Sequence, residues 1–312
     1  MDESKLDRQA VVEAAARLAG VVVEPPLIAA RIGGRALWLK CECLQTGGAF
    51  KLRGASNRLL RMSAEERARG VVAFSSGNHA QGVAIAAKRL NIAATIVMPS
   101  DAPQLKIAGT RAEGAEVIFY DRRTESREAI AAALAAERGS IVVPSFDDAD
   151  VIAGQGTVGL EIVAQLGRPP ERIVTPCGGG GLAAGLALAC PDADIILVEP
   201  DGWDDMGRSL RGGAIVPVGA DAPPTLCDAL QTPRVSPLTF AVLRDATALR
   251  VSDAEVTAAV RWAWTEHRLM VEPGGAAALA AILAGKSPIG GDTVAILSGG
   301  NIEPALHARL VG

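Results

Sequence analysis

Short apolar runs alternate with longer amphipathic stretches along nearly the whole chain. The runs stay apolar at successive positions, as strands covered on both faces do. We predict strands at Ala36–Cys41, Val71–Phe74, Ala94–Met98, Glu116–Tyr120, Ile141–Pro144, Arg172–Pro176, Asp194–Val198, Leu249–Val251 and Thr293–Leu297. We predict helices at Asp7–Leu18, Ala55–Met62, Ala80–Leu90, Thr124–Arg138, Thr157–Leu166, Leu182–Ala189, Ala254–Arg268 and Ala276–Leu283.

This order of elements indicates the fold class. Strand–helix alternation over the whole length predicts an α/β fold with one or two open, mostly parallel sheets. Two capping boxes, Ser63 with Glu66 and Ser252 with Glu255, support helix starts. The stretch 217–237 has five prolines and no clear period, so we expect it to wrap the surface.

Composition and charge exclude several classes of protein. Apolar residues make up 49% of the 312 residues and the net charge is −4, which excludes disorder and gives no basic footprint for nucleic acid. The charged segment Met1–Arg8 lacks the apolar stretch that a signal peptide has, and no apolar stretch reaches the roughly 18 residues of a membrane span. Five cysteines without a C-x-x-C pair indicate reduced thiols. We therefore expect a cytoplasmic protein that binds neither nucleic acid nor membrane.

Glycine is in excess, with 34 residues, or about 11% of the chain against a usual roughly 7%. Four consecutive glycines, Gly178–Gly181, follow a predicted strand and precede a predicted helix. Backbone amides without Cβ atoms in the way, at a helix N-terminus, form a ready anion site. Gly178, Gly180 and Ala183 also fit G-x-G-x-x-A, with Glu199 at the end of the next strand. Judged on this loop alone, a nicotinamide dinucleotide is the alternative ligand.

Three further segments carry candidate chemistry. Lys51 is one of only six lysines and lies in the glycine-rich segment Thr46–Gly54. A desolvated lysine has a lowered pKa and can act as a nucleophile. Ser75–Gly82 begins a helix, where its amides and hydroxyls suit a carboxylate, simple helix capping being the alternative. Ser298–Asn301 ends the last predicted strand, where ligand crevices of open α/β sheets lie.

Together these segments resemble the fold-type II pyridoxal-phosphate enzymes, the tryptophan synthase β superfamily. Within it, the chain is similar to the serine/threonine dehydratase and serine racemase group. The motifs are F-K-L-R-G-A from Phe50, S-S-G-N-H-A-Q-G from Ser75, V-I-A-G-Q-G-T from Val151, G-G-G-G from Gly178, V-E-P-G-G-A from Val271 and L-S-G-G-N from Leu297. The resemblance implies two open, mostly parallel twisted sheets with helices on both faces. They would form a large domain of residues 1–69 and 148–312 and a small domain of residues 70–147.

The resemblance also implies roles for single residues. Lys51 would bind pyridoxal 5′-phosphate through a Schiff base and later move the Cα proton. Ser76 matches a serine that can reprotonate Cα from the opposite face. The residues expected around the cofactor are Phe50 beside the ring, Asn78 at the 3′-oxygen, Gly178, Gly179, Gly180 and Gly181 at the phosphate, and Ser298 at the pyridine nitrogen. Glu272 would lie near the ring, with helix capping as an equal alternative. The residues expected at the substrate carboxylate are Ser75, Gly77, Asn78 and His79.

The implied reaction is β-elimination of a β-hydroxy amino acid to a 2-oxo acid and ammonia. A neutral hydroxyl from Ser298 at the ring nitrogen favours expulsion of a β-leaving group. The alternatives are an amino acid racemase on the same scaffold and a nicotinamide oxidoreductase, which leaves Lys51 unexplained.

The substrate stays open among serine, threonine, 3-hydroxyaspartate and bulkier amino acids. The segment Val143–Asp148 departs from the family's H-P-F-D-D at Pro144 and Ser145, and it helps to line the substrate site in the family. We expect no metal, because Asp228 has no nearby Glu in the sequence and a hard cation usually needs two carboxylates. We also expect a homodimer.

Overall fold

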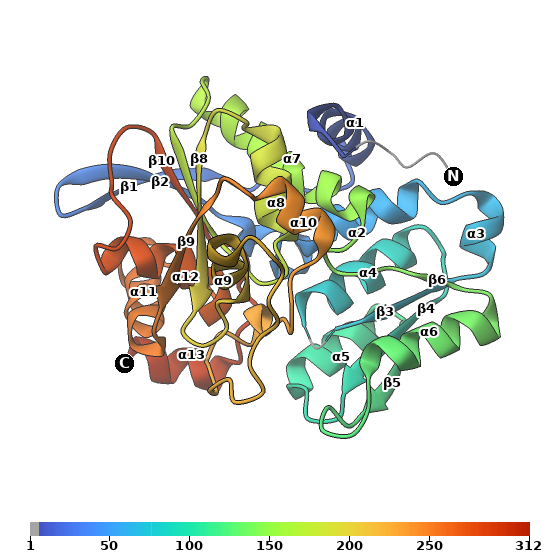
Figure 1. The fold of residues 1–312 in the computed structure, drawn as a ribbon. Coiled ribbons are helices and arrows are strands. Elements are labelled where there is room, and N and C mark those ends of the chain that lie inside the picture. The colour runs from blue at the N-terminus through green and yellow to red at the C-terminus, as the bar shows by residue number, and fades with distance from the viewer. Residues whose placement is uncertain (1–5, 76) are drawn as a thin grey trace.

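The computed structural model describes residues 6–75 and 77–312, whose strands form two separate sheets (Figure 1). The six-stranded sheet has the order β1 (Leu27–Ile32), β2 (Arg35–Lys40), β10 (Thr293–Ile296), β7 (Arg172–Pro176), β8 (Asp194–Pro200) and β9 (Thr247–Val251). The four-stranded sheet has the order β5 (Glu116–Tyr120), β4 (Ala94–Pro99), β3 (Val71–Phe74) and β6 (Ile141–Val142). Among these strands, only β1 and β2 pair antiparallel. The predicted fold class is confirmed, while the domain boundaries stay predictions.

Helices surround both sheets (Figure 1). They are α1 (Arg8–Leu18), α2 (Lys51–Leu60), α3 (Ala64–Ala68), α4 (Asn78–Arg89), α5 (Gln104–Ala112), α6 (Arg127–Arg138), α7 (Ala149–Leu166), α8 (Gly181–Ala189), α9 (Asp205–Gly212), α10 (Pro237–Val242), α11 (Asp253–His267), α12 (Pro273–Leu283) and α13 (Pro304–Val311). Short 3-10 turns are η1 (Glu42–Leu44), η2 (Thr46–Gly48) and η3 (Asp228–Leu230). Both predicted capping boxes are present. In the part of the chain that the structure describes, no helix is both long and apolar enough to cross a membrane.

The large sheet separates two hydrophobic cores. Successive residues of a strand point to opposite faces. On β8, Ile195 and Leu197 therefore belong to the core beside α7 and α8, and Ile196 and Val198 to the core beside α11 and α12. Because both faces are covered, the central positions of the strand, Ile195 to Val198, are all apolar, which explains the continuous apolar runs of the sequence.

Two departures from the predicted elements have local causes. Strand β1 was not predicted, although Gly33 and Gly34 carry the signal for it. Their φ angles of 55° and 80° form the two-residue turn of a hairpin, which only glycine adopts without strain. Helix α7 begins at Ala149 rather than at Thr157, because the Asp148 side chain accepts the amide of Val151 at 2.9 Å and caps the helix.

The extended helix α7 is in backbone contact with two other helices. A Cβ atom at Gly154 would lie 2.7 Å from Cα of Gly54 on α2. A Cβ atom at Gly156 would lie 2.7 Å from the carbonyl oxygen of Gly185 on α8. Helix α7 thus joins the helix that begins with Lys51 to the helix that follows the four glycines.

We expect Gly154→Ala to lower the free energy of unfolding by about 1–3 kcal/mol, because the added methyl overpacks the α2–α7 contact. Gly212→Ala is the matched control. Gly212 also lies in a helix, and a Cβ there would meet no atom within 4 Å. This variant should leave the free energy of unfolding unchanged or raise it by up to about 1 kcal/mol. Urea denaturation of both variants measures the difference, and equal values would contradict the close contact.

Candidate active site

A cavity of about 110 Å³, open to solvent, lies where the carboxyl ends of strands from both sheets come together. Its wall includes the segments after β3, β7 and β10 and the N-termini of α2, α4 and α8. The predicted site residues that line it are Phe50, Lys51, Ser75, Gly77, Asn78, His79, Gly178, Gly179, Gly180, Gly181 and Ser298. Glu272 is buried behind Asn78, and Ser76 lies outside the described residues. The structure thus brings together segments far apart in the sequence, while the role of each residue stays a prediction.

Lys51 is the first residue of α2, and its side chain lies at the wall of the cavity. Its Nζ donates a hydrogen bond of 2.8 Å to the carbonyl of Ser145 and lies 5.1 Å from the ring centre of Phe50. Burial lowers the pKa of this amine to about 8. A substantial neutral fraction therefore exists near neutral pH, and the neutral amine is the form that attacks a carbonyl group.

The four glycines form a cradle that side chains would fill. A Cβ atom at Gly179 would lie 2.3 Å from the ring of Phe146, and one at Gly178 would lie 3.0 Å from Oγ1 of Thr232. Gly180 has a φ of 86° and stands at the N-cap of α8. The first amides of a helix have no partner within the helix and carry the positive end of its dipole. A loop that keeps side chains away from such amides fits a phosphate group.

Asn78 is held from behind by two other side chains. Its Nδ2 donates a hydrogen bond to Oε1 of Glu272, and its Oδ1 accepts a hydrogen bond of 2.8 Å from Nδ2 of Asn301. Burial raises the pKa of Glu272 to about 7, against the opposing effect of Lys106. Although Glu272 stands at the N-cap of α12, its side chain makes no capping hydrogen bond. Its carboxyl orients the cavity residue Asn78, so helix capping, the alternative for Glu272, is not what the structure shows.

His79 is neutral in this environment. Its Nε2 lies 2.9 Å from the carbonyl oxygen of Val143, which can only accept a hydrogen bond, so Nε2 carries the hydrogen and donates it. Burial and the nearby Lys51 lower the pKa of the imidazole to about 3. His79 therefore cannot donate a proton as an imidazolium at neutral pH.

Ser298 is fixed relative to Lys51 through the backbone. Its carbonyl accepts the amide of Phe50 at 3.2 Å, and its own amide donates to the carbonyl of Gly275 at 3.3 Å. The side chain is 6% exposed and lines the cavity. The end of the last strand and the start of α2 thus form one wall.

The structure adds cations that the sequence analysis missed. Lys106 on α5 forms an ion pair of 2.5 Å with Asp228 of η3, and its Nζ lies 3.9 Å from Oε2 of Glu272. Burial opposes the charge of Lys106, but the two carboxylates outweigh it and raise the pKa of the ammonium group. Arg127, the first residue of α6, lines the cavity with its guanidinium 5.5 Å from the ring centre of Phe74.

One expectation about this region is confirmed only in part. The proline-rich stretch is exposed or half-buried over residues 217–224, but it then turns inward, and Asp228, Leu230 and Thr232 line the cavity. The structure also places Glu272 near Asp228, with Lys106 beside both, although no Glu lies near Asp228 in the sequence. The scarcity of lysine, which singled out Lys51, would have singled out Lys106 as well.

Glu199, on which the nicotinamide alternative depends, is engaged elsewhere. Its carboxylate accepts the amides of Met206 at 2.9 Å and Gly207 at 2.8 Å, at the start of α9. Within the described part of the chain, it is not among the residues that line the cavity. It is therefore occupied in holding a helix, and a ribose hydroxyl would have to displace those amides.

Comparison with known proteins gives a consistent result. The family described as "pyridoxal-phosphate dependent enzyme" matches residues 9–299. An L-threo-3-hydroxyaspartate ammonia-lyase from a Pseudomonas species is 43% identical, over 96% of this chain and 97% of that protein. One from Saccharomyces cerevisiae is 41% identical, over 96% of this chain and 95% of that protein. The structure of maize serine racemase superposes with a TM-score of 0.91 at 35% identity, covering 97% of this chain and 96% of that one.

The lowered pKa of Lys51 predicts how the cofactor-free protein captures pyridoxal 5′-phosphate. The rate at which visible absorbance appears should rise by about tenfold per pH unit at low pH and level off above about 8, because only the neutral amine reacts. N-acetyl-lysine, an exposed amine, is the control, because its reaction includes the same titration of the cofactor. Its reaction rate should level off only near pH about 10.4, the ordinary lysine pKa. Lys51→Ala should give no such absorbance, and a rate for the native protein that still rises at pH 10 would contradict the burial effect.

Proposed function

The chain belongs to the family of pyridoxal-phosphate-dependent enzymes, and on that premise we propose that it is an ammonia-lyase that acts on β-hydroxy amino acids. We propose L-threo-3-hydroxyaspartate as its preferred substrate. The observation that carries the proposal is the buried amine of Lys51, which faces a cavity bounded by an anion cradle at one wall and by additional cations at another. The two similar ammonia-lyases support the choice of substrate.

The residues present fit the cofactor. The amides of Gly178–Gly181 would hold the phosphate, and Phe50 would lie beside the ring. Ser298 would face the pyridine nitrogen, and Asn78 would bind the 3′-oxygen. When bound, pyridoxal phosphate supplies the electron sink that makes a Cα proton removable. The protein supplies the position of the groups and the electrostatics around them.

Proton transfer falls to Lys51. Its neutral Nζ accepts the Cα proton, and the β-hydroxyl leaves as water after gaining a proton. His79 is neutral and binds Val143 through Nε2, so it positions the start of α4 rather than donating this proton. The released enamine tautomerises to an imine, which water hydrolyses to a 2-oxo acid and ammonia. For 3-hydroxyaspartate the 2-oxo acid is oxaloacetate.

Substrate choice depends on a second carboxylate. The N-terminus of α4, with Ser75 and Asn78, would bind the α-carboxylate. Lys106 is already paired with Asp228, whereas Arg127 binds Glu128 through Nε alone in the contacts of the described residues. The Nη groups of Arg127 are therefore free to bind a side-chain carboxylate in the forked geometry that a guanidinium provides.

The function is tested by the release of 2-oxo acid from a panel of serine, threonine and L-threo-3-hydroxyaspartate. We expect the highest kcat/KM for L-threo-3-hydroxyaspartate in the native enzyme and no release by Lys51→Ala. A Lys51→Ala variant with native activity would overturn the proposal that this enzyme is a lyase that uses Lys51.

The role of Arg127 is tested by Arg127→Gln in the same assay. Loss of a hydrogen-bonded charge pair should lower kcat/KM for L-threo-3-hydroxyaspartate by about 10- to 100-fold. The kcat/KM for serine, which has no second carboxylate, should change by less than about threefold on the same reasoning. Arg123→Gln, a neighbouring exposed arginine, is the control and should change neither value. Equal losses for both substrates would show that Arg127 does not select the substrate.

Racemisation is the second candidate activity, favoured by the close superposition on maize serine racemase. It requires a proton donor on the face of Cα opposite Lys51, and Ser76, the residue predicted for that role, lies outside the described residues. Chiral analysis of the L-serine that remains after incubation decides it. The appearance of D-serine would establish this activity, and enantiopure L-serine would exclude it.

A further inference from the structure

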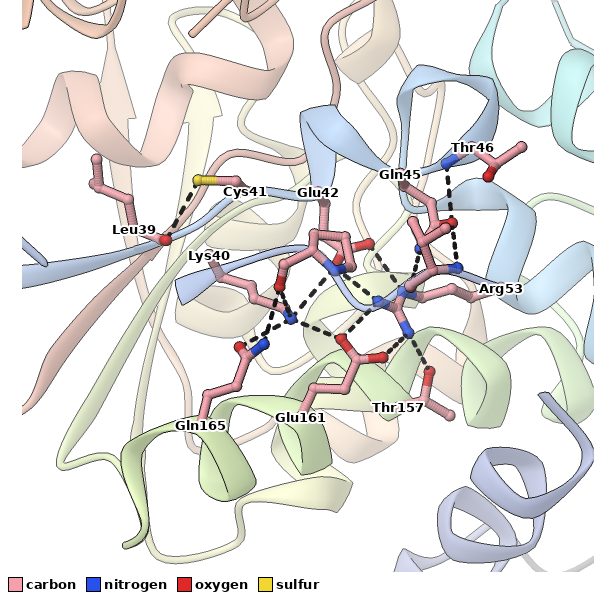
Figure 2. A network of polar contacts seen from close by, with 12 residues as sticks. Leu39, Lys40, Cys41, Glu42, Gln45, Thr46, Arg53, Thr157, Glu161 and Gln165 are labelled. Atoms are coloured by element: carbon pink, nitrogen blue, oxygen red, sulfur yellow. Dashed lines mark hydrogen bonds and ion pairs between the residues drawn. The ribbon is translucent and has the colours of Figure 1, made fainter. Parts of the chain in front are cut away.

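We propose that Arg53 is a positioning residue, which sets the place of Lys51 in the active site through a buried ionic network. The inference rests on the proposed function to the extent that Lys51 is the group that moves the Cα proton. The Arg53 network consists of Arg53, Lys40, Glu42 and Glu161, with polar contacts from Thr157 and Gln165 (Figure 2).

Arg53 binds two carboxylates at the same time. Its Nε and Nη2 donate to the two oxygens of Glu42 at 2.8 Å and 2.9 Å. Its Nη1 and Nη2 donate to the two oxygens of Glu161 at 2.6 Å and 2.8 Å. Nη1 also donates to Oγ1 of Thr157 at 3.0 Å. The side chain of Arg53 is fully buried, so these bonds fix its planar fork in one orientation.

Lys40 completes the charge balance of the network. Its Nζ donates to Oε2 of Glu161 and to the carbonyl of Pro25, both at 2.6 Å, and lies 4.0 Å from Glu42. Two cations therefore face two anions, and Lys40, Glu42 and Arg53 are fully buried while Glu161 is partly exposed. Removal of one partner would leave an uncompensated buried charge, which is far more costly than the loss of an exposed pair.

The network ties α2 to three other elements. Lys40 ends β2, Glu42 begins η1, and Glu161 and Thr157 lie on α7 (Figure 2). At Gly54, the residue that follows Arg53, the backbone of α2 is also in close contact with α7 at Gly154. The first turn of α2 is thus held against both rotation and displacement.

Lys51 and Arg53 belong to that same turn. Residues two positions apart on an α-helix point about 200° apart around its axis. With Arg53 clamped on the side of Glu42 and Glu161, Lys51 is directed to the opposite side, where its Nζ meets the carbonyl of Ser145 at the cavity. A rotation of the helix would therefore move Nζ away from the place where a substrate proton has to be taken.

An ionic network is not needed simply to hold α2 against its neighbouring elements. Apolar residues of similar volume often hold helices together as well as a buried ion network does. A forked arginine adds direction, because its bonds break when the helix turns. Lysine cannot reproduce the fork with a single ammonium group.

The test compares Arg53→Lys with two controls in the holoenzyme. Arg58→Lys alters a partly exposed pair with Asp148 that also joins α2 to the start of α7. Ile162→Val removes a methylene from the buried face of α7 without touching the network. Arg53→Lys should lower kcat by about 10- to 100-fold with KM within about threefold of native, since small displacements of a reacting group carry losses of that order. Both controls should keep native kcat.

A second measurement uses the cofactor-free protein. The pKa of Lys51 is read from the pH dependence of its trace acetylation, followed by mass spectrometry that separates positions 51 and 53. Arg53→Lys should raise this pKa from about 8 towards the ordinary lysine value, because a displaced amine regains water. Glu161→Gln, which removes one carboxylate of the fork with little change in volume, should shift kcat and this pKa in the same directions. It replaces Arg53→Lys if that variant does not fold.

Native kcat together with an unchanged Lys51 pKa in these variants would overturn the proposal. Equal losses in Ile162→Val at a matched fall in melting temperature would also overturn it, because stability alone would then account for the effect. The acetylation measurement does not depend on turnover. If the native enzyme released no 2-oxo acid from the panel, the proposed function would fail, while the Lys51 pKa would still decide the role of Arg53.

Discussion

The active site depends on the contact of helix α7 with α2 and α8. Gly54 meets Gly154 on one side of α7, and Gly156 meets Gly185 on another, so the three backbones approach more closely than side chains would allow. Lys51 begins α2, and the glycine cradle begins α8. Contact through a common helix therefore fixes the distance between the start of α2, with Lys51, and the start of α8, with the four glycines.

Burial and charge then set the chemistry of the site. In the contacts of the described residues, Lys51 has a carbonyl partner and no carboxylate partner. No negative charge therefore opposes the effect of burial, which lowers the pKa of Lys51 to about 8. Lys106 is also buried, but Asp228 and Glu272 raise its pKa, and it stays a cation. The pKa values of two lysines in one cavity are thus shifted in opposite directions, because one lysine has anionic neighbours and the other does not.

The sequence predicted the local parts of this arrangement and missed the parts that depend on distant contacts. Four consecutive glycines and a lysine in a glycine-rich segment are local signals, and the structure places both at one cavity. The pairing of Lys106 with Asp228 joins positions 122 residues apart, and no local pattern marks it. Helix α7 was predicted too short because the local capping signal of Asp148 was missed, whereas the close packing of Gly154 against α2 cannot be seen in one segment.

The same distribution of groups suggests why the two sheets have to act together. The groups proposed to hold the substrate, at the start of α4 and at Arg127, follow strands of the four-stranded sheet. The proposed phosphate cradle and Ser298 follow strands of the six-stranded sheet. The Lys106–Asp228 pair joins α5, which follows a strand of the four-stranded sheet, to η3, which lies between two strands of the six-stranded sheet. The proposed substrate and cofactor groups therefore meet only when the two sheets hold their relative position, and an ion pair with one buried partner, Lys106, is suited to maintain it.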